Sequence, residues 1–209
     1  MEVLAYQLPD AVMFREGEPE PGWLVWVPDH TCLVLGASNQ PEVSLYPDRV
    51  ERDQIPVYKR PSGGETVILT PNTLVISVRL PDPGKQNPNI FFKQINHLII
   101  NALQNAGVDS LGQRGISDIA IGEKKILGSS IYRKREMVFY HAVLNLSEPA
   151  ETIGRYIRHP KREPDYRRGR DHAEFVTSLS EAGYSFSPES IATLLEHAFQ
   201  QEKLFDPLG

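Results

Sequence analysis

Short strand-forming runs separated by turn residues recur between residues 23 and 146 of this chain. Each run is rich in valine, isoleucine, leucine or aromatic residues, and glycine, proline or aspartate residues separate many of them. Such runs predict β-strands joined by tight turns. The predicted strands span residues 23–27, 32–35, 56–60, 66–69, 74–78, 118–121, 125–132 and 137–146.

Turn residues also suggest which strands are neighbours. We expect residues 56–60 and 66–69 to form a strand pair around Ser62-Gly63-Gly64, because adjacent glycines favour hairpin turns. We expect residues 118–121 and 125–132 to form a hairpin that turns at Gly122-Glu123.

Helical periodicity is present in two segments. Apolar residues recur at helical spacing over residues 89–105, and Gly107 follows them. Ser187 and Pro188 favour the start of a second helix over residues 188–203. Strands and helices do not alternate regularly, so we predict an α/β (α+β) fold with a mixed, largely antiparallel central sheet covered by helices. We expect a single domain over residues 1–209.

Composition narrows the class of protein. The chain has 209 residues, a net charge of -5, 40% hydrophobic residues and one cysteine. This charge gives no general attraction to nucleic acid or membranes, and one cysteine excludes an internal disulfide. We find no signal-peptide pattern, and no apolar run approaches the roughly 20 residues that cross a bilayer. We therefore expect a cytoplasmic protein without nucleic-acid or membrane partners.

The segment Lys59–Val67 contains the first candidate site. Gly63 and Gly64 let backbone N–H groups approach an anionic ligand closely. Arg60 is expected to add a bidentate contact to the same anion. Ser-Gly-Gly is also an ordinary hairpin turn, and that interpretation stays open.

Lys125 and His141 are further candidates within predicted strands. Alternation along residues 125–132 places Lys125 on one face with Leu127 and Ser129, which favours a role in neutralising charge over simple solvation. An exposed hairpin lysine is the alternative. His141 lies in an apolar strand, where a buried structural histidine is more common than a metal ligand, and no second ligand lies at metal spacing.

Five sequence blocks follow one another between residues 23 and about 147. They are Leu35–Pro41, Lys59–Val67, Ser117–Ile119, Glu123–Ser130 and His141–Leu144. Their order and content resemble the biotin/lipoate A/B protein ligase family, most closely the catalytic domain of its lipoate–protein ligase A branch.

The resemblance implies the fold of class II aminoacyl-tRNA synthetases and biotin synthetases, without a C-terminal accessory domain. It implies that ATP and Mg²⁺ activate lipoate or octanoate as an acyl-adenylate, and that the acyl group passes to a lysine of a lipoyl-domain protein. Transfer is expected to need a separate accessory subunit, as in two-part members of the family. Motif matching assigns Lys125 as catalytic, and substrate or nucleotide binding to Arg60, Ser62, Gly63, Gly64, Glu65, Thr66, Val67, Ile68, Asp118, Gly128, Ser129 and His141.

The chain departs from the family pattern at several positions. Glu65 replaces a third glycine, Leu69 and Thr70 replace His-Asp, and Ala142 replaces a glycine. Glu65 would place a carboxylate beside the expected phosphate site, where like charges repel. These departures weaken the expectation of ATP use more than the expectation of acyl binding.

Two alternative functions remain open at this point. A lipoyl or octanoyl transferase of the same fold would need a cysteine nucleophile, which in similar transferases precedes the position of Asp118. Cys32 instead lies mid-strand and is better explained as a core residue. A non-catalytic subunit that binds a lipoyl partner is the other alternative, and Glu65 favours it. A biotin ligase is disfavoured because the Gly-Arg-Gly-Arg loop is missing.

Residues 155–170 form a basic stretch in which Glu163 and Asp165 are the only acids. Pro160 and Pro164 predict a loop. It is either a solvated connector or a lid or docking site for an acidic acceptor. The basic residues are Arg155, Arg158, Lys161, Arg162, Arg167, Arg168 and Arg170.

Overall fold

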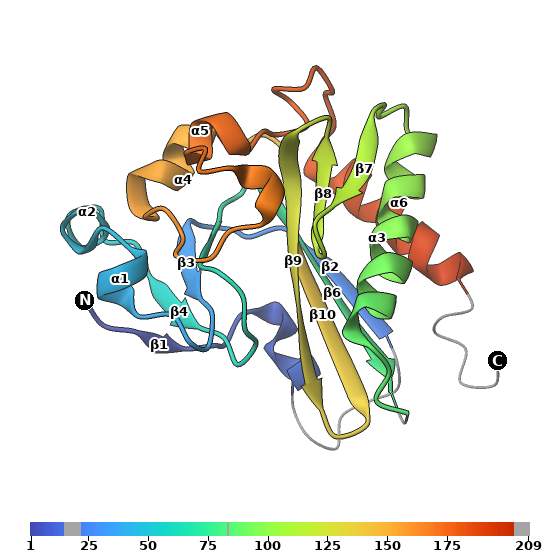
Figure 1. Cartoon of the computed structure of the whole chain (residues 1–209), viewed down its shortest axis with the longest axis horizontal. Coiled ribbons are helices and arrows are strands. Elements are labelled where there is room, and N and C mark those ends of the chain that lie inside the picture. Colours follow the sequence, from blue (N-terminus) through green and yellow to red (C-terminus); the bar gives the residue numbers. More distant parts are fainter. Residues whose placement is uncertain (15–21, 83, 203–209) are drawn as a thin grey trace.

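A six-stranded antiparallel sheet forms the larger part of the molecule (Figure 1). The computed structural model describes residues 1–14, 22–82 and 84–202. The strand order is β2-β6-β10-β9-β8-β7. The strands are β2 (Gly22–Trp26), β6 (Thr73–Pro81), β7 (Leu111–Arg114), β8 (Asp118–Ile121), β9 (Lys124–Lys134) and β10 (Met137–Asn145).

Two long helices, α3 (Pro88–Asn105) and α6 (Pro188–Gln201), pack on one face of this sheet (Figure 1). Their apolar residues, such as Ile95, Ile99 and Leu195, are fully buried against the sheet. Both predicted helices are confirmed, including the Ser187 side chain as N-cap of α6. The last predicted residue of α6, position 203, lies outside the described residues.

A second sheet of four short strands lies beside the other face (Figure 1). Its order is β1-β4-β3-β5, with β3 parallel to β4 and antiparallel to β5. The predicted pairing of residues 56–60 with 66–69 is therefore wrong, because β3 lies between these strands and hydrogen-bonds both. The strands are β1 (Leu4–Ala5), β3 (Cys32–Leu35), β4 (Val57–Lys59) and β5 (Val67–Leu69).

Short helices surround the second sheet (Figure 1). They are the 3-10 helices η1 (Pro9–Phe14) and η2 (Asp165–Arg167), with α1 (Pro41–Ser44), α2 (Pro47–Arg52), α4 (Ala150–Tyr156) and α5 (His172–Phe175). The predicted mixed, largely antiparallel architecture with covering helices is confirmed, as is the hairpin of β8 and β9. None of the described helices is both long enough and apolar enough to span a bilayer.

Candidate functional site

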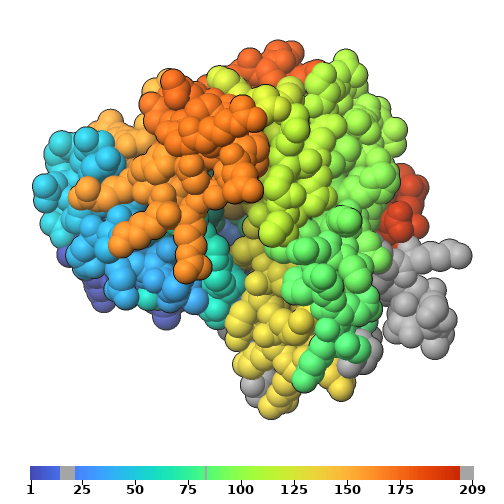
Figure 2. Space-filling model, viewed as in Figure 1, coloured from blue at the N-terminus to red at the C-terminus, as the bar shows by residue number. Residues whose placement is uncertain are grey.

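A cavity of about 1180 Å³ lies between the two sheets. Val75 and Val143 of the larger sheet and Val67 of the smaller one contribute to its wall. Residues 157–167 and α5 close another side, and in Figure 2 their orange surface lies beside both the blue N-terminal surface and the yellow-green surface of the larger sheet. All predicted site residues line this cavity except Ser62 and Gly63.

Lys125 reaches the cavity because β9 contains a β-bulge. Leu127 pairs with Ile119, but Lys125 pairs with Ala120, so Ile126 is an extra residue on β9. The extra residue shifts the alternation of side chains by one. The prediction that Lys125 shares a face with Leu127 and Ser129 is therefore wrong. It shares the face of Asp118 and Gly128, which pair directly.

An ion pair fixes the end of the Lys125 side chain. Its Nζ lies 2.8 Å from Asp118 Oδ1, and the Tyr166 hydroxyl donates to Asp118 Oδ2 at 2.9 Å. A Cβ atom at Gly128 would lie 2.5 Å from the same Nζ, so glycine leaves the space that the ammonium group occupies. Asp118 is almost fully buried, whereas 28% of the Lys125 side chain is exposed. The ammonium group is thus held in place but remains accessible from the cavity.

Arg60 is surrounded by protein acceptors and does not face the open anion site that the sequence had predicted. Its side chain is buried, and Nε donates to Ser62 Oγ at 3.0 Å. Nη1 donates to the Val34 carbonyl, and Nη2 donates to the carbonyls of Gly63 and Glu65. The predicted bidentate contact to a ligand anion is wrong for this conformation, because at most one N–H remains. Arg60 holds the glycine loop, and burial lowers its pKa to about 10.

The glycine loop also fits closely against its neighbours. Gly64 has a φ of +92°, the left-handed region that favours glycine. A Cβ atom at Gly36, which follows β3, would lie 2.0 Å from the Gly64 carbonyl oxygen. The loop and the end of β3 are therefore in close contact, and a side chain at Gly36 would separate them.

A buried polar network connects the glycine loop to the larger sheet. The Ser62 hydroxyl accepts from Arg60, which leaves its own hydrogen for His141 Nε2 at 2.7 Å. Burial holds the pKa of His141 well below 6.5, so its ring is neutral and can accept this hydrogen bond. His141 is thus a structural residue at the cavity wall, which agrees with one of its two predicted roles.

Asp10 and Tyr6 complete this network, and neither was predicted as a site residue. Asp10 is fully buried, and it accepts hydrogen bonds from the Tyr6 hydroxyl at 2.7 Å and from Ser77 at 2.8 Å. His141 Nδ1 lies 4.0 Å from the same carboxylate. Burial raises the pKa of Asp10, while its hydrogen bonds oppose the shift. Both residues precede the first predicted strand, so no local pattern identifies them.

Glu65 projects from the glycine loop into the cavity. Desolvation raises the pKa of its carboxyl group, and the charges of Arg60, Arg162, Arg167 and Lys125 oppose that shift. Its carboxylate forms no hydrogen bond or ion pair with any residue that the structure describes. A free carboxylate therefore shares the cavity with several cations.

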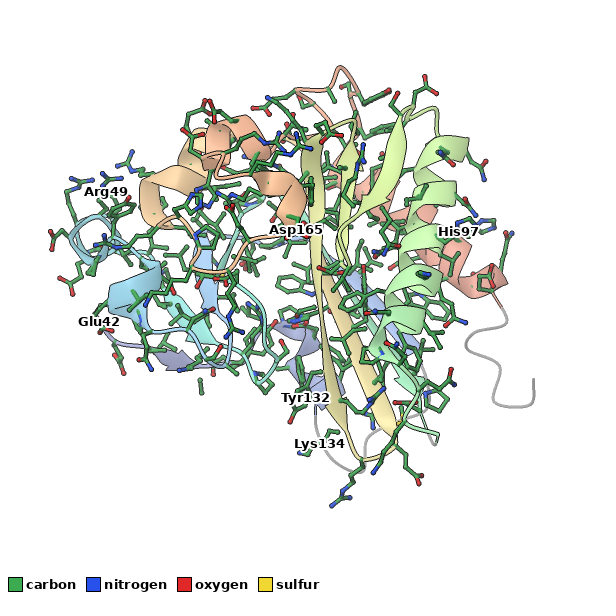
Figure 3. The ribbon with its side chains drawn as sticks, in the orientation of Figure 1. Glu42, Arg49, His97, Tyr132, Lys134 and Asp165 are labelled. Carbon is green, nitrogen blue, oxygen red and sulfur yellow. The ribbon has the colours of Figure 1, made fainter. Side chains whose placement is uncertain are left out.

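The basic stretch of residues 155–170 is partly folded and partly buried, so it is more than a solvated connector. Arg155 lies in the last turn of α4 and donates a hydrogen bond to the Asp53 carboxylate. The Arg158 side chain donates to the Leu45 carbonyl. Arg167 is 4% exposed, whereas Arg168 is exposed to solvent. In Figure 3, Asp165 of this stretch is labelled well above Tyr132 and Lys134, which lie toward the lower end of β9.

Comparison with protein families gives one match over most of the chain. Residues 5–200 match the model of the lipoyl protein ligase A/B catalytic domain. Lipoate-protein ligase A of Psychrobacter cryohalolentis is 31% identical over 130 residues, which cover 61% of this chain and 36% of that protein. The chain matches between 36% and 42% of the length of the curated relatives.

Solved structures share the fold. A bi-partite lipoate protein ligase from Thermoplasma acidophilum, described with its E2 lipoyl domain, has a TM-score of 0.76 at 19% identity, covering 90% of this chain and 73% of that one. Lipoate-protein ligase A bound with ATP has a TM-score of 0.62 at 19% identity, covering 92% of this chain and 87% of that one.

Proposed function

Because this chain belongs to the lipoyl protein ligase A/B catalytic domain family, we propose that it activates lipoate or octanoate with ATP and transfers the acyl group to a lipoyl-domain lysine. One observation carries the proposal. Lys125 is an accessible ammonium group, fixed by Asp118 over Gly128, on the wall of a cavity that the glycine loop also lines.

The proposed reaction has two steps. The acid's carboxylate attacks the α-phosphorus of ATP, which forms an acyl-adenylate and releases pyrophosphate. The acceptor lysine's neutral amine then attacks the acyl carbonyl, which releases AMP, and the amine loses its proton. Negative charge develops on oxygen in both steps, and Lys125 is placed to stabilise it. Asp118 and Tyr166 position Lys125 and do not react.

The cavity wall supports acyl binding as well as charge stabilisation. Val34, Val67, Val75 and Val143 present aliphatic surface to the cavity, which suits the hydrocarbon chain of lipoate or octanoate. The polar side chains of His141, Ser62 and Arg60 already hydrogen-bond to one another, so they do not need the acyl chain as a partner. The acyl chain therefore meets apolar side chains, and its carboxyl end would point toward Lys125.

Magnesium is expected to accompany ATP. In the described part of the chain, no three His, Cys, Asp or Glu side chains gather as a metal-binding group. Magnesium bound with a nucleotide takes many of its ligands from phosphate oxygens and water, which this chain does not need to supply. The ion would neutralise part of the triphosphate charge.

An acceptor lipoyl domain is the proposed partner, and a separate accessory subunit is proposed for the transfer step. The Thermoplasma ligase is described as bi-partite and was studied with an E2 lipoyl domain, which supports both proposals. A cytoplasmic location also remains a prediction, based on composition.

The decisive experiment supplies octanoate, ATP, Mg²⁺ and a purified lipoyl domain, with and without an accessory subunit. We expect pyrophosphate release that depends on octanoate, and a mass increase of the lipoyl domain by one octanoyl group. Hydroxylamine should trap the acyl-adenylate when the acceptor is omitted. ATP-independent transfer from an octanoyl carrier protein would instead identify a transferase.

Cys32→Ala separates the ligase from the thioester transferase. Cys32 is 1% exposed and packs in the small core with Val34 and Leu69, outside the cavity wall. Burial raises the pKa of its thiol to about 12, so the thiolate nucleophile is scarce at neutral pH. The variant should keep its activity, with a packing cost of about 1 kcal/mol. Loss of transfer in a folded variant would support the transferase.

A non-catalytic binding subunit is the second candidate, because Glu65 places a free carboxylate in the cavity. It predicts binding of a lipoyl domain without adenylate formation under any of these conditions. If Glu65→Gly then formed the adenylate, Glu65 would be the cause of the missing activity.

A further inference from the structure

Arg167 is a buried cation with an unused donor. Only 4% of the residue is exposed, and it belongs to the cavity wall. Its Nη2 atom is buried and has no hydrogen-bond partner among the described residues. A buried donor without a partner costs about 1–3 kcal/mol, and more when the group is charged. Such an atom at a cavity wall points to a ligand that supplies the missing acceptor.

Neighbouring groups fix the orientation of this guanidinium. Its Nε donates to the Arg170 carbonyl at 2.9 Å and lies 3.5 Å from Glu163 Oε2. Its carbon Cζ lies 4.8 Å from the centre of the Phe175 ring. The Nε edge and one flat face are thus occupied, and the Nη end remains. This end is the part of arginine that binds phosphate through parallel hydrogen bonds.

The Arg167 segment is also tied to Lys125. The preceding residue, Tyr166, donates to Asp118, and Asp118 holds the Lys125 ammonium. The Arg167 guanidinium lies over the Phe175 ring. The next residue, Val176, forms a β-bridge with Lys125, and the backbone N–H of Thr177 donates to the Lys125 carbonyl at 2.9 Å. These contacts place Arg167 and Lys125 around one region of the cavity from different segments of the chain.

We propose that Arg167 and Lys125 together bind a phosphate group of the nucleotide, the role first predicted for Arg60. This inference rests on the proposed function. Arg60 donates to the glycine loop and to the Val34 carbonyl, whereas Nη2 of Arg167 has no partner among the described residues. Glu65 shares this wall, so its carboxylate weakens the binding of a phosphate by charge repulsion.

Calorimetry with AMP and adenosine tests the phosphate site without any catalytic turnover. The wild-type protein should bind AMP at least tenfold more tightly than adenosine. Arg167→Gln should reduce this preference to within about twofold while adenosine affinity stays unchanged. Arg168→Gln is the matched control, because Arg168 is the exposed next residue, and it should keep the full preference. Octanoate affinity should not change in Arg167→Gln, which separates a phosphate site from a site for the acyl carboxylate.

Two further variants keep the proposal falsifiable. If Arg167→Gln does not fold, Arg167→Lys decides, because lysine keeps the charge but lacks the fork; its AMP preference should fall at least threefold. Glu65→Gln should raise AMP affinity severalfold. A wild-type AMP preference in a folded Arg167 variant, or equal binding of AMP and adenosine by the wild type, would overturn the proposal. Failure of the proposed function is distinguishable, because AMP preference can persist where no acyl-adenylate forms.

Discussion

Lys125 and Arg60 both line the cavity, but their hydrogen bonds give them different roles. Arg60 is buried and donates to Ser62 and to three backbone carbonyls, so it stabilises the loop. Lys125 has one ion-pair partner and remains accessible. A ligand can therefore bind Lys125 without disturbing the glycine loop. Binding to Arg60 would instead require Arg60 to give up hydrogen bonds that hold this loop.

Lys125→Ala is expected to lower acyl transfer by roughly 100-fold or more, about 3 kcal/mol in the barrier, because a charge that stabilises the transition state is removed. The free energy of unfolding should change little, since Asp118 keeps its hydrogen bond from Tyr166. Single-turnover kinetics and urea denaturation measure the two effects. Near-normal transfer in the variant would remove Lys125 from the mechanism.

Arg60→Ala is expected to act mainly on stability. It leaves the carbonyl groups of Val34, Gly63 and Glu65 without their donors, and we expect the free energy of unfolding to fall by about 3 kcal/mol. Urea denaturation measures this loss, with Arg168→Gln as an exposed control. An unchanged stability, together with weaker AMP binding, would restore Arg60 as the phosphate ligand.

At the level of elements, the segment from residue 157 to α5 joins the two sheets. It lines the cavity, reaches Asp118 through Tyr166, and contacts Lys125 through Val176. Arg158, Arg167 and Arg170 donate hydrogen bonds within the fold, so the expectation of a basic docking surface applies to the exposed Lys161, Arg162 and Arg168.

His172, at the start of α5, makes the stability of this segment depend on pH. Burial lowers its pKa to about 4, and the charges of Arg167, His159 and Lys125 add to the shift while Asp171 opposes it. The unfolded chain takes up this proton near pH 6.5 and the folded protein only near pH 4. Stability is therefore lost as pH falls from about 6.5 to about 4.

His172→Gln should reduce that loss, because glutamine takes up no proton in either state. Denaturation at pH 7 and pH 5 measures the change, and buried His141 contributes its own pH dependence in both proteins. His97→Gln is the matched control, since His97 lies exposed on α3 (Figure 3). An equal pH 7 to pH 5 difference in wild type and His172→Gln would contradict the prediction.

On the scale of the whole molecule, the cavity wall draws on both sheets and on the segment that closes them. A ligand in this position contacts segments that are distant in the sequence, such as Val34, Val143 and Phe175. Binding should therefore stabilise the molecule as a unit and not one sheet alone.

A non-hydrolysable lipoyl-adenylate analogue at about 100 times its Kd should raise the free energy of unfolding by about 2.7 kcal/mol, which corresponds to roughly 5–10 °C in Tm for a domain of this size. Hydrogen exchange should slow in β3, β9 and α5 together. Protection confined to one sheet would show that the ligand does not bridge the cavity.

Local sequence patterns were sufficient to predict the long helices, most of the strands and the family. Helix periodicity, caps and β-branched runs are local properties, so α3, α6 and the hairpin of β8 and β9 could be predicted. The order of the motif blocks, through the resemblance that it carries, predicted that Lys125, Asp118 and the glycine loop belong to one site. The structure brings them to one cavity.

Tertiary structure alone decided strand neighbours and the roles of the cations. The parallel pairing of β3 with β4, the bulge at Ile126 and the burial of Arg60 and Arg167 depend on contacts between residues far apart in the chain. Local propensity carries no information about such contacts, because the same short sequence can pair with several partners or use its donors in several ways. Asp10 could not be predicted for the same reason, because its contacts with Ser77 and His141 join residues that are distant in the sequence.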